Sequence, residues 1–337
     1  MRVAILVLDR VFDSGLAAIL DVLRTADELR GRLPLPPPAW QVTTVGFTET
    51  VRTGAGLCVH TSPIAHAESC DLLVVPAVPE QRPGELAAFL SGPESAPARE
   101  LITRTRARRT PIATACAGTF LLAETGILDG LSATTTWWLA PLFRRRYPHV
   151  TLDQSRMVTE SDGITTAGAA FAHTDLALNL VRRRSPALAD LVASYLVLDE
   201  RPSQAAHTIS GTLAAADPIV AAFERWARER LHEPLSIRAA AEALGVSERT
   251  LQRTTRASLG TSPVRFVQDL RVEQATHLLR STDLTIAAIA RRVGYENANT
   301  LRVLVRDRTG TTAGQHRRTP PQRLAPSPPG PSSRTRG

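Results

Sequence analysis

A pattern repeated near the C-terminal end limits the possible folds of this chain more than any other feature of its sequence. Residues 235–260 read LSIRAAAEALGVSERTLQRTTRASLG, and residues 284–310, about fifty positions later, read LTIAAIARRVGYENANTLRVLVRDRTG. Each copy has an Ala-rich helical segment, a corner that contains Gly, and a polar, Arg-bearing helix that ends at Gly260 or Gly310. This composition is typical of a DNA-binding helix-turn-helix. Two ordinary helical hairpins are the alternative, but a matched repeat inside a basic segment favours DNA binding.

The positive charge of the chain is concentrated in the same region. The 337 residues include 40 Arg, no Lys and 32 acidic residues, which gives a formal charge of +8. Residues 1–218 hold 20 Arg against 22 Asp and Glu, whereas residues 219–318 hold 17 Arg against 10. A basic domain joined to a nearly neutral one indicates one part that binds nucleic acid and one that does not.

The N-terminal two thirds of the sequence predict an α/β domain. Apolar, β-rich runs such as 3–8 and 111–116 are typical of strands buried on both faces of a parallel sheet. These runs alternate with helical patterns, the first of which follows Asp13 and Ser14, its predicted capping residues. Shorter strands are predicted at 57–60 and 133–136.

Cys116 occupies the most chemically suggestive point of this region. The run 111–116 ends on it, and a predicted helix opens directly with Ala117, Gly118 and Thr119. Small residues on both sides permit the sharp turn of a nucleophile elbow, and the start of a helix favours a thiolate. A small buried residue at a tight corner gives the same pattern, so the spacing alone leaves both interpretations open.

The remaining cysteines and the N-terminus exclude other classes of protein. Cys58 and Cys70 lie in or beside predicted strands and are interpreted as structural, and no two of the three cysteines form a CxxC pair. This spacing predicts neither a disulfide framework nor a zinc site and fits a reducing cytoplasm. The opening MRVAILVLDR is too short an apolar run for a signal peptide or a membrane span. We therefore predict a cytoplasmic protein without a metal, a cofactor or membrane contact.

Two resemblances account for nearly the whole chain. Through ATACAG and the later ATTTWW, residues 1–200 resemble the DJ-1/PfpI superfamily, the class I glutamine-amidotransferase-like proteins. Through LGVSERTLQR and IARRVGYENANTLR, residues 218–318 resemble the C-terminal domain of AraC/XylS transcription regulators. This order is that of the GlxA-like regulators. It implies a flavodoxin-like α/β sandwich followed by an all-α domain with two helix-turn-helix units. Between them we predict a linker at 201–217, and after them a disordered Pro/Ser/Arg tail at 319–337.

The DJ-1/PfpI resemblance also implies a site at the elbow. Cys116 and Gly118 match the family's motif, and Asp13 falls near an acidic residue that lies close to the family's cysteine. GlxA-like members commonly have His where this chain has Thr136. Without that His we expect no hydrolase or amidotransferase chemistry, and the elbow is interpreted as a ligand-sensing site. Two further histidines are candidate bases, although a structural role is favoured: His149 and His173.

The first helix-turn-helix carries the stronger DNA-reading pattern. Ser247 is predicted to cap its second helix, and Arg249, Gln252 and Arg253 then share the outer face of that helix. Arg can bind guanine, and Gln adenine, through paired hydrogen bonds, although phosphate contact is an equal alternative for any one exposed Arg. The resemblance favours base reading by the two Arg residues.

The second helix-turn-helix is less well equipped. Its outward candidates are Asn299, Thr300 and Arg302. Val303 stands where the AraC/XylS family usually carries Arg, so we expect the first unit to supply most of the base specificity.

Together these features predict a sequence-specific transcription regulator of the AraC family. Its predicted partners are double-stranded DNA, a small-molecule effector, a second copy of the chain and RNA polymerase. One alternative is a cysteine-dependent hydrolase or amidotransferase with an accessory DNA-binding domain. Another is a scaffold whose sandwich only dimerises.

Overall fold

The structure is a computed structural model that describes residues 1–79, 82–199, 201, 204 and 217–318. The chain divides into two compact units. One contains Met1–Trp226 and Ser236–Phe266, and the other contains Ala227–Leu235 and the described residues from Val267 onward. Most of the predicted linker, and the whole predicted tail, lie outside the described residues, so the domain boundaries proposed from the sequence stay predictions.

A mixed β-sheet forms the centre of the N-terminal region. Within the described residues it has seven strands in the order β10-β11-β7-β6-β1-β2-β5. Neighbouring strands are parallel except β10 and β11, which form an antiparallel pair. The strands are β1 (Arg2–Leu6), β2 (Gln41–Gly46), β5 (Ser62–Pro63), β6 (Leu72–Val75), β7 (Ile112–Ala115), β10 (Val158–Ser161) and β11 (Ile164–Ala167).

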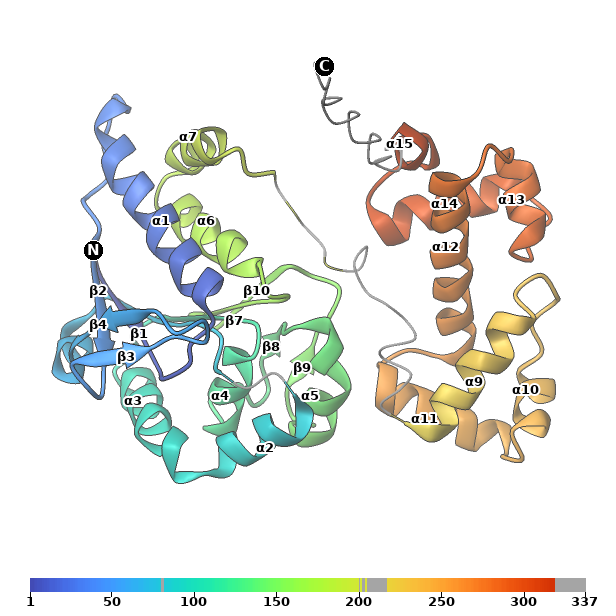
Figure 1. Ribbon diagram of the computed structural model, residues 1–337, viewed down its shortest axis with the longest axis horizontal. Helices are drawn as coiled ribbons and strands as arrows, with labels where there is room; N and C mark the ends of the chain where they lie inside the picture. Colours follow the sequence, from blue (N-terminus) through green and yellow to red (C-terminus); the bar gives the residue numbers. More distant parts are fainter. Residues whose placement is uncertain (80–81, 200, 202–203, 205–216, 319–337) are drawn as a thin grey trace, which may run out of the picture. The chain divides into compact units, whose positions relative to one another are not determined.

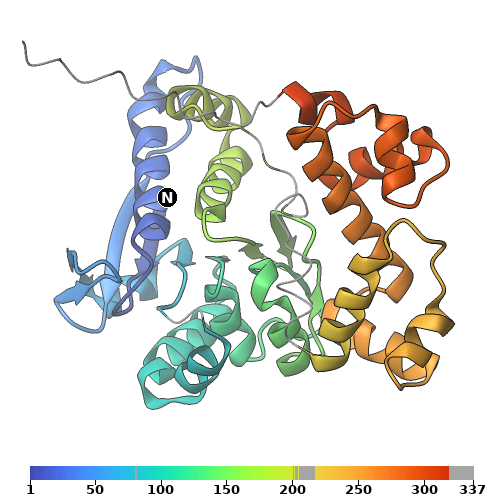
Figure 2. The same cartoon turned by 45° about the vertical axis from the view of Figure 1, so that its right-hand side comes forward.

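Helices cover both faces of this sheet (Figures 1 and 2). Val3 and Ile5 of β1 belong to the core under one group of helices, whereas Ala4 and Leu6 belong to the core under the other. One face carries α1 (Asp13–Leu29), α6 (Ala172–Arg184) and α7 (Pro186–Leu196). The opposite face carries α2 (Pro83–Ser91), α3 (Ala96–Ala107), α4 (Gly118–Glu124) and α5 (Ala140–Arg146). The predicted α/β sandwich is therefore confirmed. Both faces of β1 are buried under helices, which explains why its sequence is continuously apolar after Arg2.

Several short elements complete the sandwich and correct the sequence-based assignments. The strand predicted at 57–60 belongs to a separate hairpin, β3 (Thr50–Arg52) with β4 (Cys58–His60), and not to an edge of the main sheet. The strand predicted at 133–136 is instead β8 (Ser132–Ala133). In the described chain it pairs with β9 (Thr151–Leu152) in a separate two-stranded sheet. Short 3-10 helices occur at Arg30–Arg32, Ile64–Ser69, Pro93–Ser95 and Trp137–Leu139.

The capping of α1 also differs from the prediction. Phe12 stands at the N-cap without a side-chain hydrogen bond, and Asp13 is already the first helical residue. The Asp13 carboxylate instead accepts a hydrogen bond from the Ala55 backbone N–H at 2.8 Å. Asp13 therefore fixes a distant loop to the start of α1, a contact that local sequence does not reveal.

The C-terminal region is helical. Its helices are α9 (Pro218–Glu229), α10 (Ile237–Ala243), α11 (Glu248–Leu259), α12 (Pro263–Ser281), α13 (Ile286–Arg292), α14 (Ala298–Thr309) and α15 (Ala313–Arg318). Asp217 caps α9, since its Oδ1 accepts from the Ile219 and Val220 N–H groups at 2.9 and 3.2 Å. Among the described helices, none combines the length and apolar character needed to cross a bilayer.

The two sequence repeats form two matching helix-turn-helix units, α10–α11 and α13–α14. Gly245 and Gly294 turn the corners with φ of +66° and +79°, where residues with a side chain are strained. Gly260 and Gly310 end the second helices, both with φ of +71°. The repeat seen in the sequence therefore extends to the backbone conformation of the turns and caps.

Candidate functional site

Helix α11 has one buried face and one exposed, cationic face. Ser247 caps it, since its side chain accepts from the Thr250 N–H at 3.1 Å, as predicted. Leu251 is fully buried, whereas Arg249, Gln252 and Arg253 are exposed. In the described part of the chain, neither Arg side chain makes a hydrogen bond or an ion pair. The three predicted readers therefore lie on one accessible face with their donors available to a ligand.

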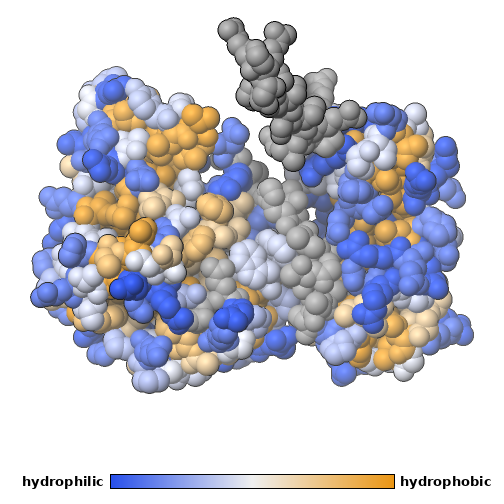
Figure 3. Space-filling model, viewed as in Figure 1, coloured by the Kyte–Doolittle hydropathy of each residue, from blue (hydrophilic) through white to orange (hydrophobic). Residues whose placement is uncertain are grey.

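Helix α14 presents a weaker version of this surface. Asn299, Thr300 and Arg302 are exposed, but the Arg302 guanidinium donates to the Asn299 amide oxygen at 2.5 Å. Val303 is 50% exposed, so the position that usually carries Arg in the family displays an apolar side chain. Val305, on the opposite side of α14, is fully buried in the core of the second helix-turn-helix. Hydrophilic side chains nevertheless dominate the visible face of the C-terminal helices (Figure 3).

Cys116 forms the sharp strand-to-helix turn that its neighbours in the sequence predict. Its φ of +57° is in the left-handed region, and its N–H donates to the Ala167 carbonyl of β11 at 2.8 Å. Gly118 is required at the following turn, because a Cβ there would lie 2.4 Å from Thr114 Oγ1 and 2.6 Å from the Pro76 carbonyl oxygen. The elbow therefore arises from close packing of α4 on β6 and β7.

The environment of the Cys116 thiol does not favour a thiolate. The residue is 0% exposed, and burial raises the pKa of its thiol to about 12, against small opposing effects of the Ala117 N–H and the Thr136 hydroxyl. Thr136 is also fully buried, and within the described chain its Oγ1 lacks a partner with hydrogen-bond geometry. Burial therefore outweighs the effect of the short α4 at this cysteine.

The other elbow candidates from the sequence, Asp13 and His173, have hydrogen-bond partners of their own. No hydrogen bond joins Asp13 to Cys116 in the described residues, and the Thr53 hydroxyl and the Ala55 N–H keep the pKa of the Asp13 carboxyl low. His173 is buried, with Nε2 accepting from the Ala77 N–H at 3.1 Å and Nδ1 facing the Ala170 carbonyl at 2.7 Å.

The two histidines considered as bases are therefore poorly placed for that role. Burial lowers the pKa of His173 to about 4, and both of its ring nitrogens are engaged by backbone groups. His149 is exposed. Of the other cysteines, Cys70 is buried and Cys58 is exposed, and neither is part of a disulfide. Within the described ranges, no group of His, Cys, Asp or Glu side chains is arranged to hold a metal ion.

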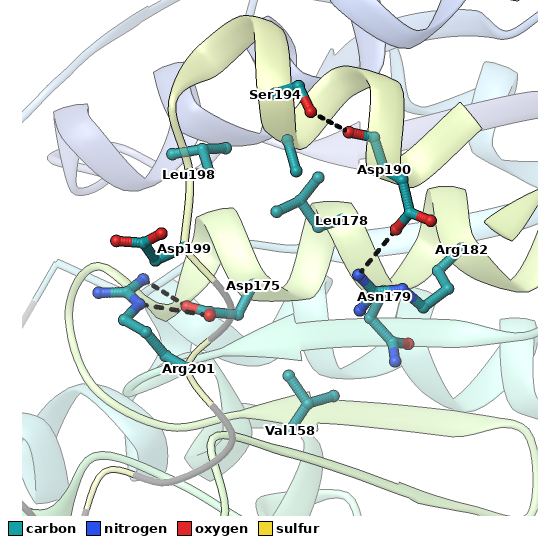
Figure 4. A pocket seen from close by; sticks show the side chains of 11 residues that line it. Val158, Asp175, Leu178, Asn179, Arg182, Asp190, Ser194, Leu198, Asp199 and Arg201 are labelled. Carbon is teal, nitrogen blue, oxygen red and sulfur yellow. Dashed lines mark hydrogen bonds and ion pairs between the residues drawn. The ribbon is translucent and has the colours of Figure 1, made fainter. Parts of the chain in front are cut away.

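An open cleft of about 390 Å³ lies between α6, α7 and the chain that follows α7 (Figure 4). Arg201 enters it and pairs with Asp175, with Nε 3.3 Å from Oδ1, and also donates to the Phe171 carbonyl at 2.9 Å. Burial raises the pKa of Asp175, and the Arg201 guanidinium opposes that effect. On the other side of the cleft, Arg182 pairs with Asp190 at 3.7 Å. The charged residues Arg201, Asp175, Arg182 and Asp190 are thus paired with one another. We interpret the Arg201 contacts as an anchor that holds this residue to α6.

A second anchor was missed by sequence reasoning. Gln204 is fully buried, and its amide nitrogen donates to the Thr135 carbonyl at 2.9 Å and to Thr134 Oγ1 at 3.2 Å. Nothing in the polar sequence around Gln204 indicates this position, because the segment has neither helical nor strand periodicity. The structure thus fixes two residues of the segment that leads from the sandwich toward α9.

Comparisons with known proteins are consistent with these two regions. Residues 1–183 match the DJ-1/PfpI family, and residues 240–319 match a helix-turn-helix domain family. The HTH-type transcriptional regulator CdhR of Pseudomonas aeruginosa is 30% identical over 63% of this chain and 65% of its own. The HTH-type transcriptional regulator GlxA of Rhizobium meliloti is 26% identical over 83% of this chain and 84% of its own.

Not every relative is covered to the same extent. The chain spans half the length of the Pseudomonas aeruginosa regulator GbdR, at 26% identity over 53% of this chain. Among solved structures, an AraC family transcriptional regulator from Pseudomonas putida is 22% identical, with a TM-score of 0.47 over 58% of this chain and 98% of that one.

Proposed function

The chain belongs to the DJ-1/PfpI family, and from that premise we propose that it is a sequence-specific DNA-binding transcription regulator of the AraC type. The observation that carries the proposal is the exposed face of α11. Arg249 and Arg253 have no ion-pair partner in the described chain, and Gln252 lies between them. Donors spaced in this way on a capped helix can contact base edges in the major groove of DNA. The excess positive charge of residues 219–318 supports attraction to phosphate.

We propose that the N-terminal sandwich senses a small molecule and is not an enzyme. A cysteine nucleophile needs a base within hydrogen-bond reach or a lowered pKa. Cys116 has a raised pKa, and Thr136 takes the place of the family's usual His. The rival hypothesis, a hydrolase or amidotransferase with an accessory DNA-binding domain, requires a proton acceptor that the described residues do not place at this thiol.

The remaining partners are proposed on less direct grounds. A homodimer is supported by exposed large side chains at the C-terminal end of α7, where Tyr195 is 52% and Val197 88% exposed. RNA polymerase is proposed as a partner because a bound regulator acts on transcription. The odd number and wide spacing of the cysteines support a cytoplasmic location.

The experiment that tests this function is genome-wide footprinting, followed by fluorescence-anisotropy titration of a recovered site with Arg253→Ala. We expect the substitution to weaken binding to that site by about 1–3 kcal/mol and to relax base preference at one position. Arg225→Ala, which removes an equal charge from an exposed position of α9, is the matched control. An equal loss of affinity on all DNA sequences would show that Arg253 contacts phosphate, and failure to recover any site would contradict the proposed function.

A further inference from the structure

Gln204 fills a buried site that is built from neutral oxygen atoms. Its Nε2 donates to the Thr135 carbonyl at 2.9 Å, to Thr134 Oγ1 at 3.2 Å and to the Arg156 carbonyl at 3.4 Å. The Gln204 backbone N–H also donates, to the Ser155 carbonyl at 3.0 Å. Three acceptors converging on one nitrogen define a position that selects an N–H donor.

Glycine makes the room for this side chain. A Cβ at Gly168 would lie 2.3 Å from Gln204 Nε2 and 2.6 Å from Gln204 Cδ. The amide therefore lies directly on the backbone that follows β11, and no side chain separates the two. Only glycine at position 168 allows the amide to approach the backbone this closely, so the site is shaped to fit the Gln204 side chain.

The Gln204 site lies beside the elbow. The Thr135 hydroxyl donates to the Cys116 carbonyl at 2.7 Å, and the Cys116 N–H donates to the Ala167 carbonyl, one residue before Gly168. The carboxyl ends of β7 and β11 meet here, and this edge of an open α/β sheet is where ligands usually bind. An internal side chain thus occupies the position in which a ligand is expected.

The chemistry of the site favours one class of ligand. Among the described residues, its acceptors are two backbone carbonyls and one hydroxyl, and none of these is ionised. An ammonium or guanidinium group would be buried there without a counter-charge, which is costly. A carboxylate has no N–H to donate and would face three oxygen atoms. A primary carboxamide supplies the N–H donors while remaining neutral.

We propose that this pocket is the effector site of the sensing sandwich, that it binds primary carboxamides, and that Gln204 is its internal occupant when the effector is absent. This inference rests on the proposed function as a regulator. Effector and Gln204 exclude one another, so effector binding releases the Gln204 anchor and leaves the Arg201–Asp175 anchor in place.

Competition with the Gln204 side chain limits the affinity with which a small amide binds this site. A side chain anchored through Arg201, three residues away, competes at an effective concentration of order millimolar. A minimal amide therefore binds the intact protein weakly, and a natural effector needs contacts beyond the amide group. Removing the Gln204 side chain removes the competitor and leaves the acceptors in place.

The test uses the full chain and Gln204→Ala, which leaves a gap the size of acetamide. We expect acetamide to raise the thermal unfolding temperature of Gln204→Ala, and to bind it at least about tenfold more tightly than the wild type in calorimetric titration. Acetate, which lacks the N–H donors, and ethylammonium, which is charged, are expected to have no such effect. Equal responses of the two proteins to acetamide, or equal responses of Gln204→Ala to all three compounds, would overturn the proposal.

A second variant keeps the outcome interpretable if Gln204→Ala folds poorly. Gln204→Glu retains the size of the side chain but loses its N–H donors, so acetamide should compete with it more readily than with Gln204. Binding to a footprinted DNA site is measured on the wild-type protein. No DNA binding by the wild type, with the expected acetamide response of Gln204→Ala, would contradict the proposed function alone. DNA binding by the wild type, without that acetamide response, would contradict this inference alone.

Discussion

Thr255 is a buried polar residue on the inner face of α11. It is fully buried, and within the described chain its Oγ1 has no hydrogen-bond partner. An unpaired buried hydroxyl costs stability.

Thr255→Val should therefore raise the free energy of unfolding by about 1 kcal/mol, since it removes the hydroxyl and keeps the shape. Urea denaturation followed by circular dichroism measures this change. Thr119→Val is the matched control, because the Thr119 hydroxyl donates to the Thr134 carbonyl at 3.1 Å and its loss should destabilise. A lower stability for Thr255→Val would mean that the hydroxyl has a partner.

Cys116→Ser tests whether the thiol has a chemical role. Because the raised pKa keeps the thiol protonated at neutral pH, we expect the wild-type protein to show no turnover of amides, peptides or isonitriles. We also expect the substitution to leave affinity for a footprinted DNA site unchanged. Turnover that disappears in Cys116→Ser would establish the enzyme hypothesis in place of the sensor.

At the scale of elements, the elbow depends on close approach between α4 and two strands. Gly118→Ala should lower the free energy of unfolding by roughly 1–3 kcal/mol, since its Cβ would overlap Thr114 Oγ1 and the Pro76 carbonyl. Gly84→Ala in α2 is the control, because a Cβ there has no neighbour within 4 Å and should be neutral or stabilising. Similar losses in both variants would show that helix propensity, and not packing at the elbow, limits stability.

The two recognition helices should contribute unequally to sequence reading. Arg253 is unpaired in the described chain, whereas Arg302 already donates to Asn299. We therefore expect Arg253→Ala to reduce the ratio of specific to non-specific DNA affinity more than Arg302→Ala does. Competition titrations with matched and scrambled sites measure this ratio. A larger effect at Arg302 would reverse the assignment of the main reader to α11.

At the scale of the whole molecule, His173 makes the stability of the sandwich depend on pH. It joins α6 to the loop after β6, and its pKa falls to about 4 in the folded state because it is buried. The unfolded chain takes up this proton near the ordinary pKa of about 6.5, so the folded state binds fewer protons between pH 6.5 and 4. Stability from this group is present above pH 6.5 and is lost as pH falls toward 4.

Unfolding measured across this pH range should show a decrease of at most about 1.4 kcal/mol per pH unit from this group. His173→Gln should reduce the slope even if it lowers stability at pH 7. An unchanged slope in the variant would assign the pH dependence to other groups.

Local sequence patterns were sufficient to predict the main elements of this protein. Apolar runs specify strands covered on both faces, and the duplicated Gly corners specify two helix-turn-helix units with their readers outside. Small residues around Cys116 specify a tight turn. These features follow from the conformational preferences of residues that are neighbours in the sequence. Such preferences do not depend on tertiary contacts.

Contacts between residues that are far apart in the chain could be found only from the folded structure. Asp13 accepts a hydrogen bond from the Ala55 N–H, some forty residues away, and His173 binds the backbone at Ala77. Gln204, in a segment without periodicity, fills the site formed by Thr134 and Thr135. Such contacts depend on complementary shape and on hydrogen bonds between residues that are far apart in the chain, and no local pattern records them.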